Sequence, residues 1–233
     1  MEPEVPYRIH DSYGPDAAAQ LKFIVVLREP VARTISSWMM QLLNRDIESK
    51  DARNFEHVVS VGIQGAQRLA ACYQKSSEEG FSQREMDTRR CNAKLFLGND
   101  IETSTVSHVA KSMYAMQLER WISVFGTKNI KVIMMEDMVE NPLKTLLEVF
   151  NFIGVGFIDR TRKNGLASRE EWQHVVKAAY GMTDVDKAEE YNDQVTSVLK
   201  AKLAFFFEPY NKELTQKLGV TLSEPRIFTS QVS

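Results

Sequence analysis

Two polar side chains that lie eight residues apart, Arg28 and Ser36, are the pair in this sequence best suited to bind an anion. An arginine guanidinium presents a planar fork of donors that fits phosphate, and a serine hydroxyl adds one directed hydrogen bond. By position alone a structural role fits equally well, with Arg28 paired to an acidic neighbour and Ser36 on a helix surface. The elements that carry the two residues must therefore be considered next.

A nearly unbroken apolar, β-branched run at residues 23–27 predicts a strand buried on both faces, typical of the parallel strands of α/β sheets. Glu29-Pro30 then predicts a helix start, because proline suits the first helical position. One face of this helix is apolar and carries Val31, Ile35, Trp38 and Leu42. Arg28 would lie at the carboxyl end of the strand, where open α/β sheets bind ligands and where a helix N-terminus favours anions.

A second unit of the same kind follows later in the chain. Residues 130–135 form another apolar run, and Asn141-Pro142 caps an amphipathic helix that Gly154 ends. Two such units predict an α/β fold in which helices flank a parallel sheet.

The remaining segments predict packing helices and loops. Residues 1–20 are expected to be a poorly structured lead-in, and residues 74–90 a polar loop insertion. Further helices are expected at residues 54–73, at 114–125 before Gly126, around 191–206, and from Pro209 to Leu218 before Gly219.

Two cysteines, Cys72 and Cys91, bracket the polar segment 74–90. A disulfide would close this segment as a loop, but two free thiols fit the sequence equally well. No metal-ligand partners stand at suitable spacing, so a zinc site is not expected.

The charges of the sequence exclude some classes of partner. Twenty-nine basic and thirty-one acidic residues give a net charge of −2, so no overall basic field favours nucleic acid, and anion binding must be local. One basic cluster, Arg160, Arg162 and Lys163, is interpreted either as a solvated loop or as a loop that approaches a cofactor or glycan. No apolar run is long enough to cross a bilayer.

The sequence around Arg28 resembles that of a known family. The pattern L-R-E-P-V-x-R-x-x-S-x-W is similar to the sulfotransferase segment that holds the 3′-phosphate of 3′-phosphoadenosine 5′-phosphosulfate (PAPS). Farther along, Y-x-x-Q-L-x-x-W, I-K-V-I-M-M-E-D-M-V-E-N-P and F-F-x-P-Y-N resemble the heparan-sulfate and related carbohydrate sulfotransferases. The resemblance covers nearly the whole chain, and it implies a single sulfotransferase-like domain over residues 1–233 with a P-loop-NTPase-like fold.

The resemblance also implies a function. Arg28 and Ser36 would bind the 3′-phosphate of PAPS, and a sulfonate would pass to a hydroxyl or amine of a heparan-type glycan in the Golgi lumen. Family members begin with a glycine- and lysine-containing loop that holds the 5′-phosphosulfate, and with an acidic general base, neither of which has a counterpart in these residues. The chain is therefore expected to match the later two-thirds of such an enzyme, and its catalytic residues stay unassigned.

Two hypotheses about activity follow from the resemblance. One is a PAPS-dependent sulfotransferase in truncated form; the other is an inactive relative that keeps a nucleotide or partner site. A histidine could replace the missing base. None of the four has an acidic partner at fixed spacing, and His108, just before the helix at 114–125, is the best placed of His10, His57, His108 and His174.

Overall fold

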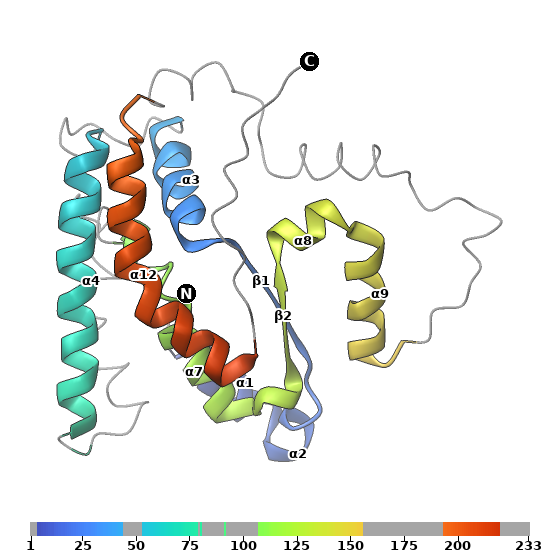
Figure 1. Ribbon diagram of the computed structural model, residues 1–233. Helices are drawn as coiled ribbons and strands as arrows, with labels where there is room; N and C mark the ends of the chain where they lie inside the picture. Colours follow the sequence, from blue (N-terminus) through green and yellow to red (C-terminus); the bar gives the residue numbers. More distant parts are fainter. Residues whose placement is uncertain are drawn as a thin grey trace.

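The computed structural model describes residues 4–43, 53–78, 80, 91, 107–155 and 193–219. Within this part, strands β1 (Phe23–Leu27) and β2 (Ile130–Met134) pair in parallel, with Phe23 opposite Ile130 and Leu27 opposite Met134. The predicted α/β fold with a parallel sheet containing both apolar runs is confirmed. The two strands end at the same edge, so the residues after Leu27 and after Met134 are neighbours in space (Figure 1).

The prediction that β1 is buried on both faces is wrong. Ile24 and Val26 are 44% and 46% exposed, whereas Leu27 is buried. Alternate side chains of a strand point to opposite faces, and one face packs on α7 (Tyr114–Phe125), where Phe23 contacts Trp121. In the described part, β1 therefore has a packed face and an open face.

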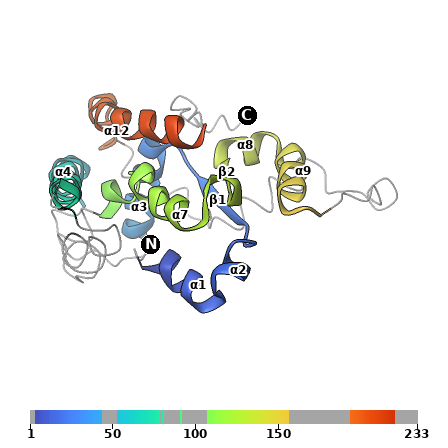
Figure 2. The same ribbon diagram turned by 90° about the horizontal axis from the view of Figure 1, so that it is seen from below.

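Most of the core lies between helices. α3 (Pro30–Leu43), α4 (Phe55–Glu78) and α12 (Ser197–Leu218) bury Trp38, Phe55, Leu203 and Phe207 among them. These helices lie side by side on one side of the sheet, while α8 (Met135–Glu140) and α9 (Pro142–Ile153) lie on the other (Figures 1 and 2). α3 starts at Pro30, as the sequence predicts, and it packs against α12, which fixes its direction as it leaves the sheet.

The expected lead-in at residues 1–20 is helical where the structure describes it, which corrects that expectation. α1 (Val5–Tyr13) and α2 (Pro15–Ala18) each carry a proline in the first turn, and Pro6 and Ala18 are buried. The Asn129 side-chain amide donates to the Ala19 carbonyl at 3.0 Å. Tertiary contacts therefore stabilise α1 and α2, which the polar local sequence does not predict to be helical.

Two helix boundaries also differ from the sequence prediction. α12 is one helix that continues through Pro209, because Phe207 before the proline and Leu214 after it are both buried in the core. α4 runs on to Glu78, so the first residues of the predicted loop at 74–90 are helical; residues 79 and 81–90 lie outside the described part.

The structure joins Cys72 and Cys91 in a disulfide whose Cα atoms are 5.7 Å apart. Cys91 is buried against the helical core, so the bridge ties the chain after α4 back to that helix. None of the described helices is long and apolar enough to span a membrane.

Candidate anion-binding site

The peptide unit between Arg28 and Glu29 is fixed from two sides at the carboxyl end of β1. The Tyr114 hydroxyl donates to the Arg28 carbonyl at 2.9 Å, and the Glu29 N–H donates to Oε1 of Glu136 at 3.0 Å. Tyr114 and Glu136 are both buried, and burial raises the pKa of Tyr114 to about 12, so its hydroxyl keeps its proton. The backbone that carries the Arg28 side chain is thus held in one position.

The side chains of the two residues expected to bind an anion have no bonding partner in the described part of the chain. Arg28 and Ser36 are half-buried, and neither side chain makes a hydrogen bond or ion pair with any other residue in the described part of the chain. Both belong to the strand–turn–helix unit, with Arg28 at the end of β1 and Ser36 in the second turn of α3. The arrangement leaves an arginine fork and a hydroxyl available to a ligand.

The helix N-terminus is not available, contrary to the sequence expectation. The carboxylate of Glu29 accepts hydrogen bonds from the N–H groups of Val31 at 2.9 Å and Ala32 at 2.7 Å. Pro30 has no N–H, and the Arg33 N–H is bonded to the Glu29 carbonyl at 2.8 Å. An anion at this site would have to be bound by side chains on the flank of α3 rather than by the first-turn amides.

Glu29 itself lies in an unusual electrostatic environment. Burial raises its pKa, the two helix amides oppose that rise, and the nearby Glu136 adds to it. The second carboxylate oxygen of Glu136 is buried and has no hydrogen-bond partner in the part of the chain that the structure describes. The two acidic side chains are therefore held at the sheet edge at an electrostatic cost.

Arg33 joins α3 to the segment before α7. Its Nη1 donates to the His108 carbonyl at 2.9 Å and lies 3.4 Å from the Ser112 hydroxyl. Next to it, the Thr34 and Ser112 hydroxyls are 3.0 Å apart. Burial lowers the pKa of Arg33, and no carboxylate among the described residues forms an ion pair with it.

His108 does not have the surroundings of a general base. Its Nδ1 lies 2.9 Å from the Ser37 hydroxyl, and its Nε2 is bonded to Oε1 of Gln41. Burial lowers the pKa of His108, the positive charges of Arg33 and Lys111 lower it further, and together they bring it to about 4. The ring is therefore neutral at pH 7, and both its nitrogens are occupied in positioning α3.

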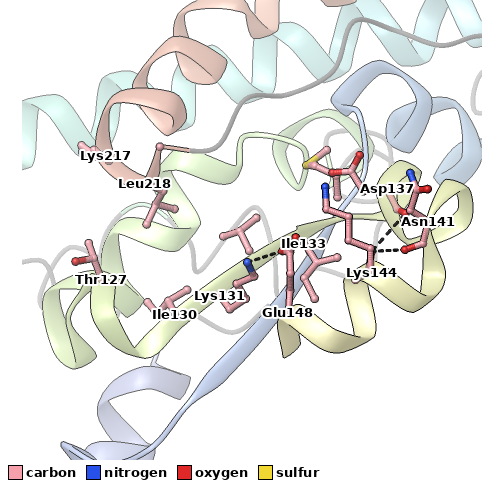
Figure 3. Close-up of a pocket in the computed structure, with 14 residues that line it drawn as sticks. Thr127, Ile130, Lys131, Ile133, Asp137, Asn141, Lys144, Glu148, Lys217 and Leu218 are labelled. Atoms are coloured by element: carbon pink, nitrogen blue, oxygen red, sulfur yellow. Dashed lines mark hydrogen bonds and ion pairs between the residues drawn. The ribbon is translucent and has the colours of Figure 1, made fainter. Parts of the chain in front are cut away.

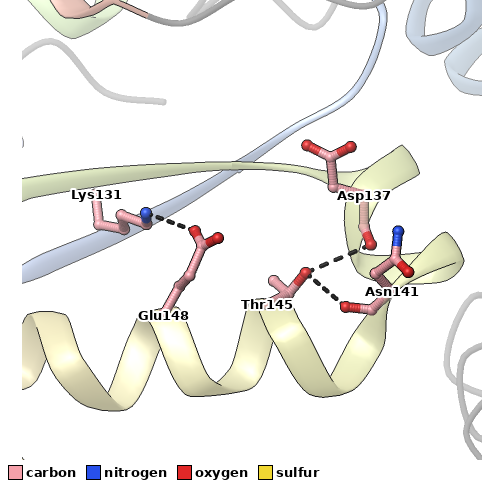
Figure 4. Close-up of polar contacts among 5 residues, drawn as sticks. All are labelled: Lys131, Asp137, Asn141, Thr145 and Glu148. Carbon is pink, nitrogen blue, oxygen red and sulfur yellow. Dashed lines mark hydrogen bonds and ion pairs between the residues drawn. The ribbon is translucent and has the colours of Figure 1, made fainter.

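A polar cleft of about 580 Å³ lies along β2, between α9 and the end of α12 (Figure 3). Lys131 pairs with Glu148 at 2.8 Å, and this bond holds the pKa of Glu148 below its usual value. The Thr145 hydroxyl donates to the Asn141 carbonyl at 3.0 Å (Figure 4). Three further polar side chains of the cleft make no hydrogen bond or ion pair within the described part: Asp137, Asn141 and Lys144.

Sequence patterns found only part of this site. Arg33 belongs to the same sequence motif as Arg28 and Ser36, so the motif itself could have identified Arg33 as a candidate. Tyr114 and Glu136 come from distant segments, and no local pattern marks them as contacts of the Arg28–Glu29 peptide. Three predicted residues, Arg160, Arg162 and Lys163, lie outside the described residues.

The chain is similar to known proteins over most of its length. The family described as "Sulfotransferase domain" matches residues 14–183. The membrane-associated sulfotransferase kil1 of Dictyostelium discoideum is 26% identical over 180 residues, which cover 59% of this chain and 38% of that protein. The solved structure of a sulfotransferase from Alicyclobacillus acidocaldarius matches with a TM-score of 0.41 and 19% identity, covering 85% of this chain and 63% of the other. The chain thus spans less than two thirds of each of these proteins.

Proposed function

Because this chain belongs to the sulfotransferase domain family, we propose that it binds PAPS through Arg28 and Ser36 and takes part in sulfonate transfer to a carbohydrate. The observation that carries the proposal is the fixed Arg28–Glu29 peptide, which presents an uncommitted guanidinium at the carboxyl edge of the sheet. Charge-assisted hydrogen bonds from Arg28 and a directed bond from Ser36 would hold the 3′-phosphate of the donor.

The reaction that this site would serve is a group transfer. The bond between the sulfonate sulfur and the bridging phosphate oxygen breaks, a bond from sulfur to an acceptor hydroxyl or amine forms, and adenosine 3′,5′-bisphosphate leaves. The acceptor loses a proton to a base. Arg28 and Ser36 anchor the donor and do not touch the reacting atoms. His108 is neutral but fully engaged, so the proposal assigns the base to none of the described histidines.

The acceptor is proposed to be a glycan of the heparan type. Support comes from the sequence motifs that resemble those of carbohydrate sulfotransferases and from the cleft along β2. Within the described residues the Lys144 ammonium makes no hydrogen bond or ion pair, so it suits an anionic group, and the side chains of Asp137 and Asn141 suit sugar hydroxyls. The Cys72–Cys91 disulfide supports an oxidising compartment, and the Golgi lumen is the one we propose.

A second candidate is a module that binds the nucleotide without turnover. It is favoured by Glu29, whose own carboxylate occupies the first-turn amides of α3 that a ligand would otherwise use. Transfer of labelled sulfonate from PAPS to heparan-type glycans separates the two candidates: turnover supports the enzyme, and tight nucleotide binding without turnover supports the module.

Calorimetry with adenosine 3′,5′-bisphosphate tests the nucleotide site, with adenosine 5′-monophosphate as the ligand that lacks the 3′-phosphate. Hydrogen bonds to charged groups contribute about 1.5–3 kcal/mol each, so Arg28→Ala should weaken bisphosphate binding roughly ten- to a hundredfold. Ser36→Ala should weaken it less. The matched control is Lys128→Ala, an exposed cation just before the amino end of β2. Equal binding of both nucleotides, or full affinity in Arg28→Ala, would refute the assignment.

A further inference from the structure

Two cations have no acidic partner in the described part of the chain: Arg33, one helical turn before Ser36 on α3, and Lys111, in the segment that Arg33 is bonded to. We propose that they complete the 3′-phosphate site by supplying the positive charge that Arg28 alone cannot. This inference rests on the proposed nucleotide function and adds two binding residues to it.

The charge of the ligand requires more than one cation. A phosphomonoester carries about −1.5 to −2 charges at pH 7, and Arg28 offsets one of them. Helix amides do not supply the rest, because Glu29 occupies those of Val31 and Ala32. The Glu29 carboxylate also adds negative charge near the site. A phosphate held by Arg28 and Ser36 therefore needs further positive side chains close by.

Arg33 is placed to provide one. It precedes Ser36 by three residues on α3, and residues three apart on a helix are neighbours on its surface. Among the described residues Arg33 bonds through Nη1 alone, to the His108 carbonyl and the Ser112 hydroxyl, so Nε and Nη2 remain there as donors. The bond to His108 fixes the guanidinium without neutralising it.

Lys111 approaches from the segment that α3 packs against. It follows His108 by three residues and is half-buried, and its side chain makes no hydrogen bond or ion pair within the described chain. Arg33 is bonded to the His108 carbonyl, and Lys111 lies in the same helical turn as His108, so the two cations are neighbours. Burial lowers the pKa of Lys111, and the charge of Arg33 lowers it further. Two partly buried like charges without a counter-charge are unfavourable, and a bound dianion would relieve this repulsion.

The other titratable groups around this pair do not take that role. His108 is neutral, the Tyr114 hydroxyl donates a hydrogen bond to the Arg28 carbonyl, and the Glu29 carboxylate accepts hydrogen bonds from the helix amides. Glu136 accepts from the Glu29 backbone. None of these groups forms an ion pair with Arg33 or Lys111, so the pair keeps its charge for a ligand.

The decisive variant is Lys111→Gln, because the Lys111 side chain makes no hydrogen bond within the described residues and the substitution keeps the main-chain bonds of this position. Titration with adenosine 3′,5′-bisphosphate at pH 7.5 should show affinity reduced about tenfold, with the melting temperature and the weak binding of adenosine 5′-monophosphate unchanged. Arg33→Lys keeps a charge but loses the fork, so it should weaken binding by a smaller factor. The matched control is Lys128→Gln, which removes one exposed lysine charge elsewhere and should bind as the wild type does.

Each outcome of these titrations decides something. Wild-type affinity in Lys111→Gln and Arg33→Lys, together with weakened Arg28→Ala, overturns this inference and leaves the proposed function standing. A wild-type chain that binds the bisphosphate no better than the monophosphate overturns both. Weakened binding in Lys111→Gln at an unchanged melting temperature supports both.

Discussion

The hydroxyl of Tyr114 donates a hydrogen bond of 2.9 Å to the main-chain carbonyl of Arg28, which lies 86 residues earlier in the sequence. The N–H of the same peptide unit is bonded to Glu136, 107 residues away. Both polar groups of one peptide are therefore satisfied by buried side chains from two other elements, α7 and α8. This arrangement sets the direction in which the Arg28 side chain leaves the sheet.

Removing the Tyr114 hydroxyl should loosen this peptide. Tyr114→Phe loses one buried hydrogen bond and should lower the free energy of unfolding by about 1 kcal/mol. Bisphosphate affinity should fall a few-fold, because Arg28 loses part of its preorganisation. Chemical denaturation and calorimetry measure the two effects. Tyr210→Phe is the control, since the hydroxyl of Tyr210 makes no hydrogen bond in the described structure; an equal effect of both substitutions would count against a special role for Tyr114.

Stability should depend on pH through His108. Its pKa is about 4 in the folded protein and 6.5 in the unfolded chain, so between these values the unfolded chain binds more protons and stability rises with pH. This group alone should add about 2 kcal/mol to the free energy of unfolding between pH 5 and pH 7. His108→Gln should remove that increment, whereas exposed His57→Gln should retain it. Parallel pH dependence in all three proteins would show that His108 does not titrate as its burial requires.

Glu29 should contribute the opposite dependence. Burial raises its folded pKa above 4.5, so the folded state binds the proton more tightly and the contribution to stability falls as pH rises through the folded value. Glu29→Gln should therefore gain stability relative to the wild type as pH rises from about 4.5. Denaturant unfolding over a pH series measures the difference in the free energy of unfolding between Glu29→Gln and the wild type. Exposed Glu56→Gln should show the wild-type pH dependence. A stability advantage of Glu29→Gln that shrinks as pH rises would contradict the assignment.

The disulfide should stabilise the helical core. Cys72 and Cys91 are 19 residues apart, and closing a loop of this length contributes about 3 kcal/mol in the chain-entropy estimate. Reduction should lower the melting temperature of the wild type and have no effect on a double Cys72→Ser, Cys91→Ser variant. The double variant should melt at or below the temperature of the reduced wild type. If reductant leaves the wild-type melting temperature unchanged, the bridge does not carry this stability.

The local features of the site could be predicted because near neighbours set them. Hydrophobic periodicity gave the two strands, proline gave the start of α3, and Gly126, Gly154 and Gly219 follow the ends of the helices that the patterns predicted. The spacing of Arg28 and Ser36 also follows from sequence, since one strand end and one helix carry both. These properties depend on backbone sterics and side-chain period over a few residues.

The sequence by itself determined which residues could bind an anion, and the tertiary structure alone decided which of them are free to do so. Glu29 takes the helix amides, Tyr114 and Glu136 converge on one peptide, and Arg33 bonds to a carbonyl 75 residues away while keeping its charge. Pro209 likewise lies within α12 because burial on both sides of it outweighs its local preference. Such outcomes depend on how α3, α7 and α8 pack together, and that packing joins groups which no pattern of neighbouring residues connects.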